Sequence, residues 1–200
     1  MKEGLLAIVI FLGIMACGDG NVRVEVDPEI QAEEDSIKIM EHLFMKGYTE
    51  DQIGSTENGV RYVILDSGSM ELIDESDFVD FNYIGITLGD TIFDTSIKEI
   101  GDSLELFYEE NPIILDGDTV SLFTRDDDQY FPFSMTYSAS GWSIELSLPG
   151  RIPGLIEGSA ATFQHISEDG SVLILIPSQL AYGSTGQGVF IEPNQPIAFE

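Results

Sequence analysis

The side chains that could form a functional site in this sequence are mostly apolar, and they lie beside predicted turns. Tyr83 and Phe93 flank one predicted turn, and one acid, Asp94, follows Phe93 directly. Ile152 precedes a predicted helix, and Tyr182 lies in a Gly-rich segment. Aromatic rings with a few fixed polar groups are typical of a pocket that binds an apolar ligand. Each of the apolar residues taken alone is more typical of the hydrophobic core, so a core and a binding pocket both stay open as interpretations of the set.

The chain lacks the residue combinations that most nucleophilic and metal-dependent enzymes use. The two histidines, His42 and His165, have no cysteine and no serine of a hydrolase motif nearby, so a nucleophilic triad is not expected. Neither the HExxH spacing of a zinc site nor a Walker loop occurs, and no GxGxxG follows a predicted strand. We therefore expect no cofactor and no catalytic metal.

The acidic residues between 116 and 128 are candidate ligands for calcium. Asp116, Asp118 and the run 126–128 supply the carboxylate oxygens that Ca²⁺ prefers. The ligand spacing of an EF-hand around its glycine is absent, which favours a solvated acidic loop. A calcium-dependent structural lipoprotein stays open as an alternative.

The charge of the chain argues against one large class of partners. Asp and Glu number 36 and Lys and Arg number 8, so the formal net charge is −28. Nucleic-acid binding depends on clustered Lys and Arg that release counterions from phosphates. We therefore expect no nucleic-acid partner. The length of 200 residues and the hydrophobic content of 43% predict one folded domain.

The N-terminus has the pattern of a bacterial lipoprotein. Lys2 precedes the apolar run 5–14, which is too short to span a bilayer as a helix, so residues 1–16 are predicted to be a signal peptide. Cys17 ends the sequence IMAC, which resembles a lipobox. A lipid on Cys17 would anchor the protein in the bacterial cell envelope, on the outer membrane facing the periplasm or the cell surface. An ordinary signal peptide with an incidental cysteine is the alternative.

Residues 17–27 are predicted to be a tether, and residues 28–58 a helical preface to the main domain. Asp27 and Pro28 form a helix-start signal as N-cap and N1 residues, and Gly47 can end the helix. The apolar residues of this helix recur three, four or seven positions apart. We expect this stripe to pack against the following domain rather than to bind a partner; its members are Ile30, Ile37, Met40 and Phe44.

Residues 59–200 have the pattern of an α+β domain. Apolar and polar residues alternate from 78 to 94 around a turn, which is typical of two strands, and Pro153 is a good first residue for a short helix. Residues 171–177 form a continuous apolar run that suits the buried centre of a sheet, and residues 197–199 begin a last strand. We expect a curved antiparallel β-sheet wrapped around one short helix, with a site at its open mouth.

Several segments of this domain resemble the FKBP-type peptidyl-prolyl isomerases. The sequence YIGITLGDTIFDTS at 83–96 is similar to the family's strand, turn and strand with a Phe-Asp pair. RIPGLIEG at 151–158 is similar to the start of its single helix. LILIPSQLAYGSTG at 173–186 resembles its Tyr-Gly loop, and IEPNQPIAF at 191–199 resembles the segment that leads into its last strand. With its N-terminal signal and helix, the chain is similar in layout to the envelope lipoproteins of that family.

The resemblance implies a pocket for a proline ring and a function in isomerising X-Pro bonds of exported polypeptides, without a cofactor. It implies that the N–H of Ile152 and the hydroxyl of Tyr182 hold carbonyl groups of the bound peptide, with Asp94 as the polar group at the rim. The pocket residues that it implies are Tyr83, Phe93, Ile152, Tyr182, Ile191 and Phe199, with Leu155 at the floor and Phe190 and Arg151 near the rim.

The chain departs from the family's pattern at the floor of the pocket and in an insertion. Leu155 stands where the family has tryptophan, which we expect to weaken binding more than turnover. Arg151 either pairs with Asp94 or a substrate acid, or is solvated. Residues 97–143 replace a short bulge, and their many aromatic residues predict a partly folded insertion that forms a flap or a partner-binding surface. A non-catalytic peptide-binding or chaperone module with the same pocket is therefore the alternative function.

Overall fold

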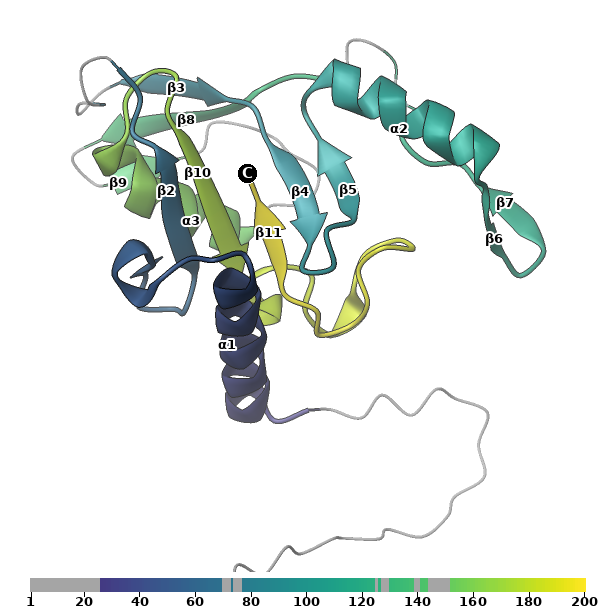
Figure 1. Cartoon of the computed structure of the whole chain (residues 1–200), viewed down its shortest axis with the longest axis horizontal. Helices are drawn as coiled ribbons and strands as arrows, with labels where there is room; N and C mark the ends of the chain where they lie inside the picture. Colours follow the sequence, from purple (N-terminus) through teal and green to yellow (C-terminus); the bar gives the residue numbers. More distant parts are fainter. Residues whose placement is uncertain are drawn as a thin grey trace, which may run out of the picture.

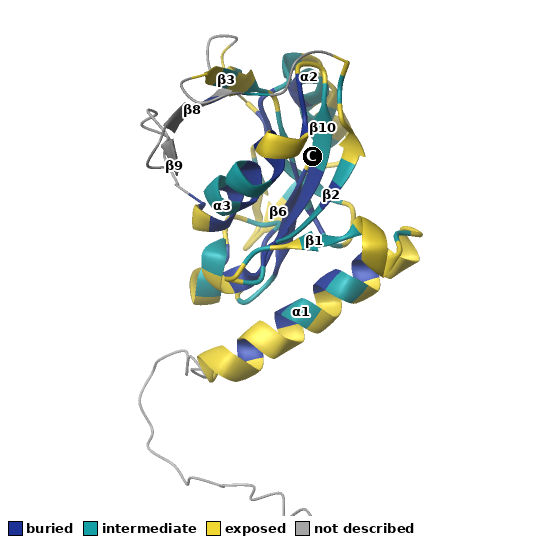
Figure 2. Ribbon diagram, turned by 90° about the vertical axis from the view of Figure 1, so that its left-hand side faces the viewer, coloured by how far each residue is buried: buried dark blue, intermediate teal, exposed yellow. Residues whose placement is uncertain are grey.

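The computed structural model describes residues 26–69, 73, 77–124, 126, 130–138, 141–143 and 152–200 (Figure 1). The predicted signal peptide, Cys17 and Arg151 lie outside the described residues. In the part of the chain that is described, no helix combines the length and the apolar character needed to cross a membrane. The predicted α+β class is confirmed: an antiparallel sheet carries one short helix on one face and an N-terminal helix on the other (Figure 2).

The main sheet has six strands in the order β1-β2-β10-β11-β4-β5. Strand β10, predicted as a central strand, pairs with β2 on one side and β11 on the other. Ile174 and Ile176 of β10 belong to the core on one face, whereas Leu173 and Leu175 belong to the core on the other. Both faces of β10 are thus buried, which explains its continuous apolar run. The strands are β1 (Gly54–Ser55), β2 (Arg61–Asp66), β4 (Ile84–Thr87), β5 (Ile92–Thr95), β10 (Ser171–Ile176) and β11 (Ile197–Phe199).

Helix α3 (Pro153–Thr162) begins at the predicted residue and packs on β10 through two glycines. A Cβ on Gly154 would lie 2.1 Å from Cγ2 of Ile176, and a Cβ on Gly158 would lie 2.3 Å from Cγ2 of Ile174. Glycine at both positions therefore allows the helix to approach the strand closely. This contact holds the N-terminal turn of α3 against the sheet.

Helix α1 (Pro28–Met45) has the predicted ends. The carboxylate of Asp27 accepts a hydrogen bond from the N–H of Glu29, and Pro28 occupies the first turn. Gly47 follows the helix with φ +92°, a left-handed conformation that favours glycine. The short 3₁₀ turn Glu50–Gln52 then leads the chain into β1.

The face of α1 that packs on the sheet is not the predicted one. Ile30, Ile37 and Phe44 are 54%, 52% and 46% exposed, and only Met40 of the predicted stripe contacts the core. The prediction that this stripe packs against the domain is therefore wrong for three of its four residues. The buried residues of the helix are Gln31, Asp35, Ile39, His42 and Leu43 (Figure 2).

Hydrogen bonds of Asp35 explain why this face of α1 is buried. Oδ2 of Asp35 accepts hydrogen bonds from the N–H and the hydroxyl of Ser178, at 2.7 and 2.6 Å. Its Oδ1 accepts one from Nε2 of Gln31 at 2.7 Å. A fully buried carboxylate is costly without such donors. These bonds orient the helix, and Ile39 and Leu43 complete the contact with the sheet.

The insertion is folded where the structure describes it, as predicted, but it contains an unexpected helix. Helix α2 (Lys98–Glu110) occupies a stretch for which no helix was predicted. The hairpin of β6 (Ile113–Leu115) and β7 (Asp118–Val120) follows, and both extend from the main sheet (Figure 1).

A second, three-stranded sheet joins the insertion to the rest of the chain. Its order is β3-β8-β9, with β3 (Phe78–Phe81), β8 (Phe133–Ser138) and β9 (Gly141–Ser143). The segment predicted as one strand before the turn at 88–90 is divided between β3 in this sheet and β4 in the main sheet. The chain thus crosses from one sheet to the other through Asn82 and Tyr83.

Candidate functional site

Aromatic rings from β11, from β5 and from the residue just before β4 meet in one cluster with residues of helix α3. The ring centroid of Phe199 on β11 lies 5.8 Å from that of Tyr83 and 5.7 Å from that of Phe93, both edge-to-face. Phe93 also contacts Tyr182, with centroids 6.2 Å apart. Edge-to-face pairs at these distances are favourable aromatic contacts. The predicted ring residues are therefore neighbours, although they are far apart in the sequence.

Gly85 on β4 makes room for these rings. A Cβ at this position would lie 2.7 Å from two ring carbons of Phe93 and 3.1 Å from Cε1 of Phe199. Any side chain here would displace Phe93. No pattern in the sequence identified this glycine as part of the site.

The aliphatic residues of the predicted pocket belong to the same apolar cluster. Ile152 at the start of α3, Leu155 one turn later and Ile191 are buried, with exposures of 9%, 4% and 3%. They share one hydrophobic core cluster with Tyr83, Phe93, Tyr182, Phe190 and Phe199. The structure thus brings together all eight apolar and aromatic residues predicted for the site.

One carboxylate lies at the edge of the ring cluster. Asp94 is partly buried, and its Oδ2 accepts a hydrogen bond from the hydroxyl of Tyr83 at 3.2 Å. Its Oδ1 accepts a hydrogen bond from the N–H of Thr95 at 2.8 Å. These bonds hold the carboxylate of Asp94 beside the rings, where it is still partly exposed to solvent.

Tyr182 keeps its proton throughout the neutral pH range. Burial, with a smaller contribution from the charge of Asp94, raises the pKa of Tyr182 to about 12. Its hydroxyl is therefore a hydrogen-bond donor at physiological pH. Within the part of the chain that is described, no residue accepts a hydrogen bond from it.

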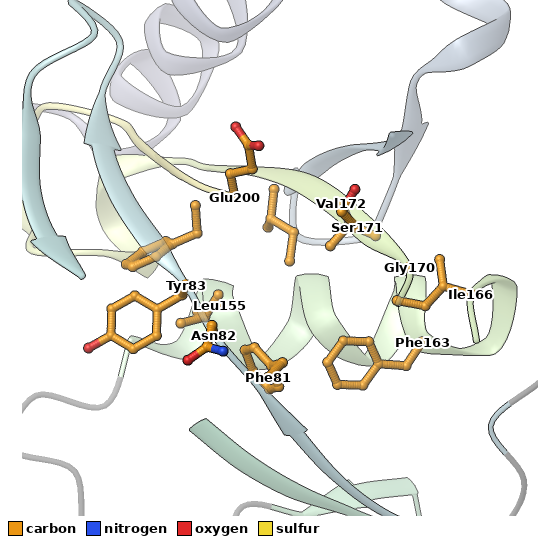
Figure 3. Close-up of a pocket in the computed structure, with 12 residues that line it drawn as sticks. Phe81, Asn82, Tyr83, Leu155, Phe163, Ile166, Gly170, Ser171, Val172 and Glu200 are labelled. Carbon is orange, nitrogen blue, oxygen red and sulfur yellow. The ribbon is translucent and has the colours of Figure 1, made fainter. Parts of the chain in front are cut away.

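A small apolar cavity of about 100 Å³ is lined in part by Tyr83 and Phe199 of the ring cluster (Figure 3). Tyr83 and Leu155 lie at one end of this cavity, and Phe163 and Ile166 lie at the other (Figure 3). The rings of Phe81 and Phe163 meet edge-to-face in its wall, with centroids 5.1 Å apart. Leu155 therefore borders open space, which a larger side chain at this position would occupy.

A second cavity, of about 170 Å³, borders Phe93. Phe93 and Ile191 of the ring cluster contribute to its wall. The remaining lining residues come from the insertion and from the loop that precedes Ile191: Leu122, Phe123, Gln187, Gly188, Val189 and Phe190.

Two further predictions about polar groups concern Arg151 and the acidic loop. Arg151 lies outside the described residues, so its pairing with Asp94 stays a prediction. Asp116 lies in the turn between β6 and β7, and Asp118 begins β7. Among the described residues, no group of three or more His, Cys, Asp or Glu is placed to hold a metal ion.

Comparisons with known proteins give similarities of fold at low sequence identity. No protein-family model matches the chain, and no curated protein matches it. The crystal structure of FkpA from Escherichia coli is 23% identical, with a TM-score of 0.45; the match covers 86% of this chain but only 58% of FkpA. A peptidyl-prolyl cis-trans isomerase from Pseudomonas syringae pv. tomato is 17% identical, with a TM-score of 0.46 over 88% of this chain and 92% of that chain.

The N-terminal domain of FKBP42 from Arabidopsis thaliana is 13% identical to the chain, with a TM-score of 0.44. That match covers 76% of this chain and 90% of the plant domain. Because these identities are below 25% and the TM-scores are below 0.5, a function for this chain has to be argued from its own residues.

Proposed function

We propose that this chain is an FKBP-type peptidyl-prolyl cis–trans isomerase that acts on X-Pro bonds of exported polypeptides. The observation that carries the proposal is the convergence of the motif residues. The segments that resemble the family are spread between residues 83 and 199, yet their apolar members share one cluster. Tyr182 and Asp94 supply two polar groups at its edge.

The activity requires no nucleophile, metal or cofactor. The barrier to rotation of the X-Pro bond is about 18–20 kcal/mol and comes from amide resonance. An apolar site removes water from the amide carbonyl and so disfavours the polar, planar form relative to the twisted one. A hundredfold acceleration needs only about 2.7 kcal/mol of preferential binding of the twisted amide.

The described residues provide parts suited to this mechanism. The rings of Phe93, Phe199 and Tyr182 contact one another and can offer an apolar surface to a pyrrolidine ring. Tyr182 is protonated and can donate a hydrogen bond to a carbonyl oxygen of the peptide. The N–H of Ile152, at the N-terminus of α3, is a second candidate donor.

A protease-coupled assay of peptide isomerisation tests the proposal. The full chain in mild detergent should accelerate isomerisation of a proline-containing tetrapeptide, and Tyr182→Ala and Asp94→Val should slow it. Asp51→Val is the matched control for Asp94, because Asp51 is an exposed acid in the 3₁₀ turn Glu50–Gln52. Absence of acceleration by the wild-type chain contradicts the proposal.

A non-catalytic peptide-binding or chaperone module is the second candidate. Large apolar side chains of the insertion are exposed to solvent, which suits the binding of unfolded chains. Leu106, Phe107, Ile114, Leu115 and Phe131 are between 43% and 63% exposed. This candidate predicts that peptides bind with little change in the isomerisation rate, and that the chain suppresses aggregation of an unfolded protein.

We further propose that a lipid on Cys17 attaches the protein to the bacterial cell envelope, most simply to the outer membrane. The IMAC sequence after an apolar run supports this proposal. Mass spectrometry of the protein from bacterial membranes should show a mature chain that begins with a lipid-modified Cys17. Cys17→Ser should leave the precursor uncleaved.

A further inference from the structure

The insertion contributes aromatic residues to the edge of the proposed proline site. Tyr108 of α2 contacts Phe190, with ring centroids 5.6 Å apart, and Phe123 lies 6.3 Å from Phe190. The rings of Tyr108 and Phe123 are stacked, with centroids 6.0 Å apart and planes 9° apart. The insertion is therefore packed against the loop that carries Phe190.

The loop that presents Phe190 is closed by hydrogen bonds at its base. Gln187 and Ile191 exchange two backbone hydrogen bonds, from Gln187 N–H to Ile191 O at 2.8 Å and from Ile191 N–H to Gln187 O at 3.2 Å. Gly188 follows with φ +55°, which turns the chain at the tip. The position of Phe190 is therefore set by a short, hydrogen-bonded hairpin.

Phe123 is held in a conformation that is costly for a bulky residue. Its φ is +59°, in the left-handed region, and its side chain is 9% exposed. Such a backbone conformation persists only where the surroundings impose it. The hydroxyl of Tyr130 donates a hydrogen bond to the carbonyl of Phe123 at 3.3 Å, and the ring packs on Tyr108.

The cavity between these parts is partly open to solvent and has the size for one apolar side chain. Its volume of about 170 Å³ compares with an apolar cavity of about 150 Å³ that binds benzene in another protein. Leu122, Phe123 and Phe190 supply apolar walls. Phe93 and Ile191 border both this cavity and the proposed proline site, so a peptide bound there would place a nearby side chain beside it.

We infer that this cavity is a subsite for a leucine- or phenylalanine-like side chain of the substrate, close to its proline, and that the insertion thereby determines substrate preference. The inference rests on the proposed isomerase function. Transfer of such a side chain from water to an apolar cavity favours binding by about tenfold or more relative to alanine. The insertion would thus select which X-Pro bonds the enzyme accepts.

A peptide series tests the subsite with the full chain in detergent. The parent peptide contains one proline with two alanines on each side. Each other peptide of the series replaces one of these four alanines with leucine, phenylalanine or glutamate. We expect one position at which leucine or phenylalanine raises kcat/KM at least about tenfold over alanine, and glutamate does not. Phe123→Gly and Leu122→Ala should remove that preference, so that the leucine, phenylalanine and alanine peptides have similar kcat/KM values.

Controls separate this subsite from general damage to the fold. Phe123→Gly removes the ring at a backbone conformation that glycine adopts without strain. Leu106→Ala truncates a leucine of α2 that is 63% exposed and should retain the wild-type preference. Melting temperatures of the variants check that each is folded.

Separate outcomes overturn the inference and the proposed function. A chain that isomerises the peptides but shows no position-specific preference, or keeps its preference in Phe123→Gly, overturns the subsite alone. A chain that accelerates no peptide overturns the proposed function. In that case, equilibrium binding of the same peptides tests whether the subsite exists. Equal affinities for the alanine, leucine and phenylalanine peptides would overturn the subsite.

Discussion

Oδ2 of Asp35 accepts two hydrogen bonds from Ser178, one from its backbone N–H and one from its hydroxyl. Ser178 begins the 3₁₀ turn that follows the central strand β10, four residues before Tyr182. Helix α1 also contacts this part of the chain through Gln179, whose Nε2 donates to the carbonyl of Pro28 at 2.6 Å. The N-terminal helix is therefore bonded to the segment that carries a proposed catalytic tyrosine.

Ser178→Ala should lower the free energy of unfolding by about 1.5–3 kcal/mol, because it removes a hydrogen bond to a buried carboxylate. Asp35→Ala should cost at least as much, since the N–H of Ser178 and the amide of Gln31 then lose their acceptor. Urea unfolding monitored by circular dichroism measures both. Glu33→Ala, on the exposed side of the same helix, should change stability by less than about 0.5 kcal/mol. Equal effects of all three substitutions would contradict this account.

Gly85→Ala should lower kcat/KM for a proline peptide by about tenfold or more, because the added methyl group displaces the ring of Phe93. Overpacking of this kind also costs about 1–3 kcal/mol of stability. Gly89→Ala in the following turn is the matched control, since the nearest atom to its Cβ would be Oγ1 of Thr87 at an ordinary 3.7 Å. Wild-type kinetics in Gly85→Ala would show that Phe93 does not act in the site.

The absorbance of the tyrosines should reveal one group that titrates near pH 12. Subtraction of the Tyr182→Phe titration curve from that of wild type should isolate Tyr182. Because its folded-state pKa is raised above the ordinary value near 10, its contribution to stability is present below about pH 10 and is lost as the pH rises toward 12. A difference curve with its midpoint near pH 10 would mean that the hydroxyl is exposed.

Because a cavity lies beside Leu155, we expect a smaller residue at this position to destabilise the protein and a larger residue to be tolerated. Leu155→Ala should destabilise the protein by about 2–5 kcal/mol, because it enlarges an existing void. Leu155→Phe should change stability by less than about 1.5 kcal/mol, since its extra carbons can enter the cavity. Thermal and urea unfolding compare the two. A larger loss with phenylalanine than with alanine would show that the cavity does not admit the ring.

The sequence predicted the bounds of α1 well and its packing face badly, for one physical reason. N-cap, N1 and C-terminal signals are local, and Asp27, Pro28 and Gly47 act within one turn. The packing face depends on partners far along the chain. Asp35 is buried only because Ser178 and Gln31 provide donors, and a count of apolar residues assigns such an acid to the surface.

Helix α2 was missed although its own pattern supports it, since Ile100, Leu104, Phe107 and Tyr108 recur at helical spacing. Gly101 lies within the helix, where glycine is unfavourable, but a Cβ there would collide with the ring of Tyr130. The site residues were predicted through the family resemblance rather than through periodicity. The resemblance did not cover the insertion, so the contacts of Tyr108 and Phe123 with Phe190 could not be predicted.

The order of strands in the main sheet also governs when this protein can fold. Val63 pairs with Leu173, and Gly85 pairs with Phe199, so neighbouring strands come from opposite ends of the chain. Such non-local pairing makes folding slow, since distant segments must meet before either is stabilised. A ribosome must therefore release β10 and β11 before the sheet can close, and the nascent polypeptide is exposed to proteases and chaperones until then.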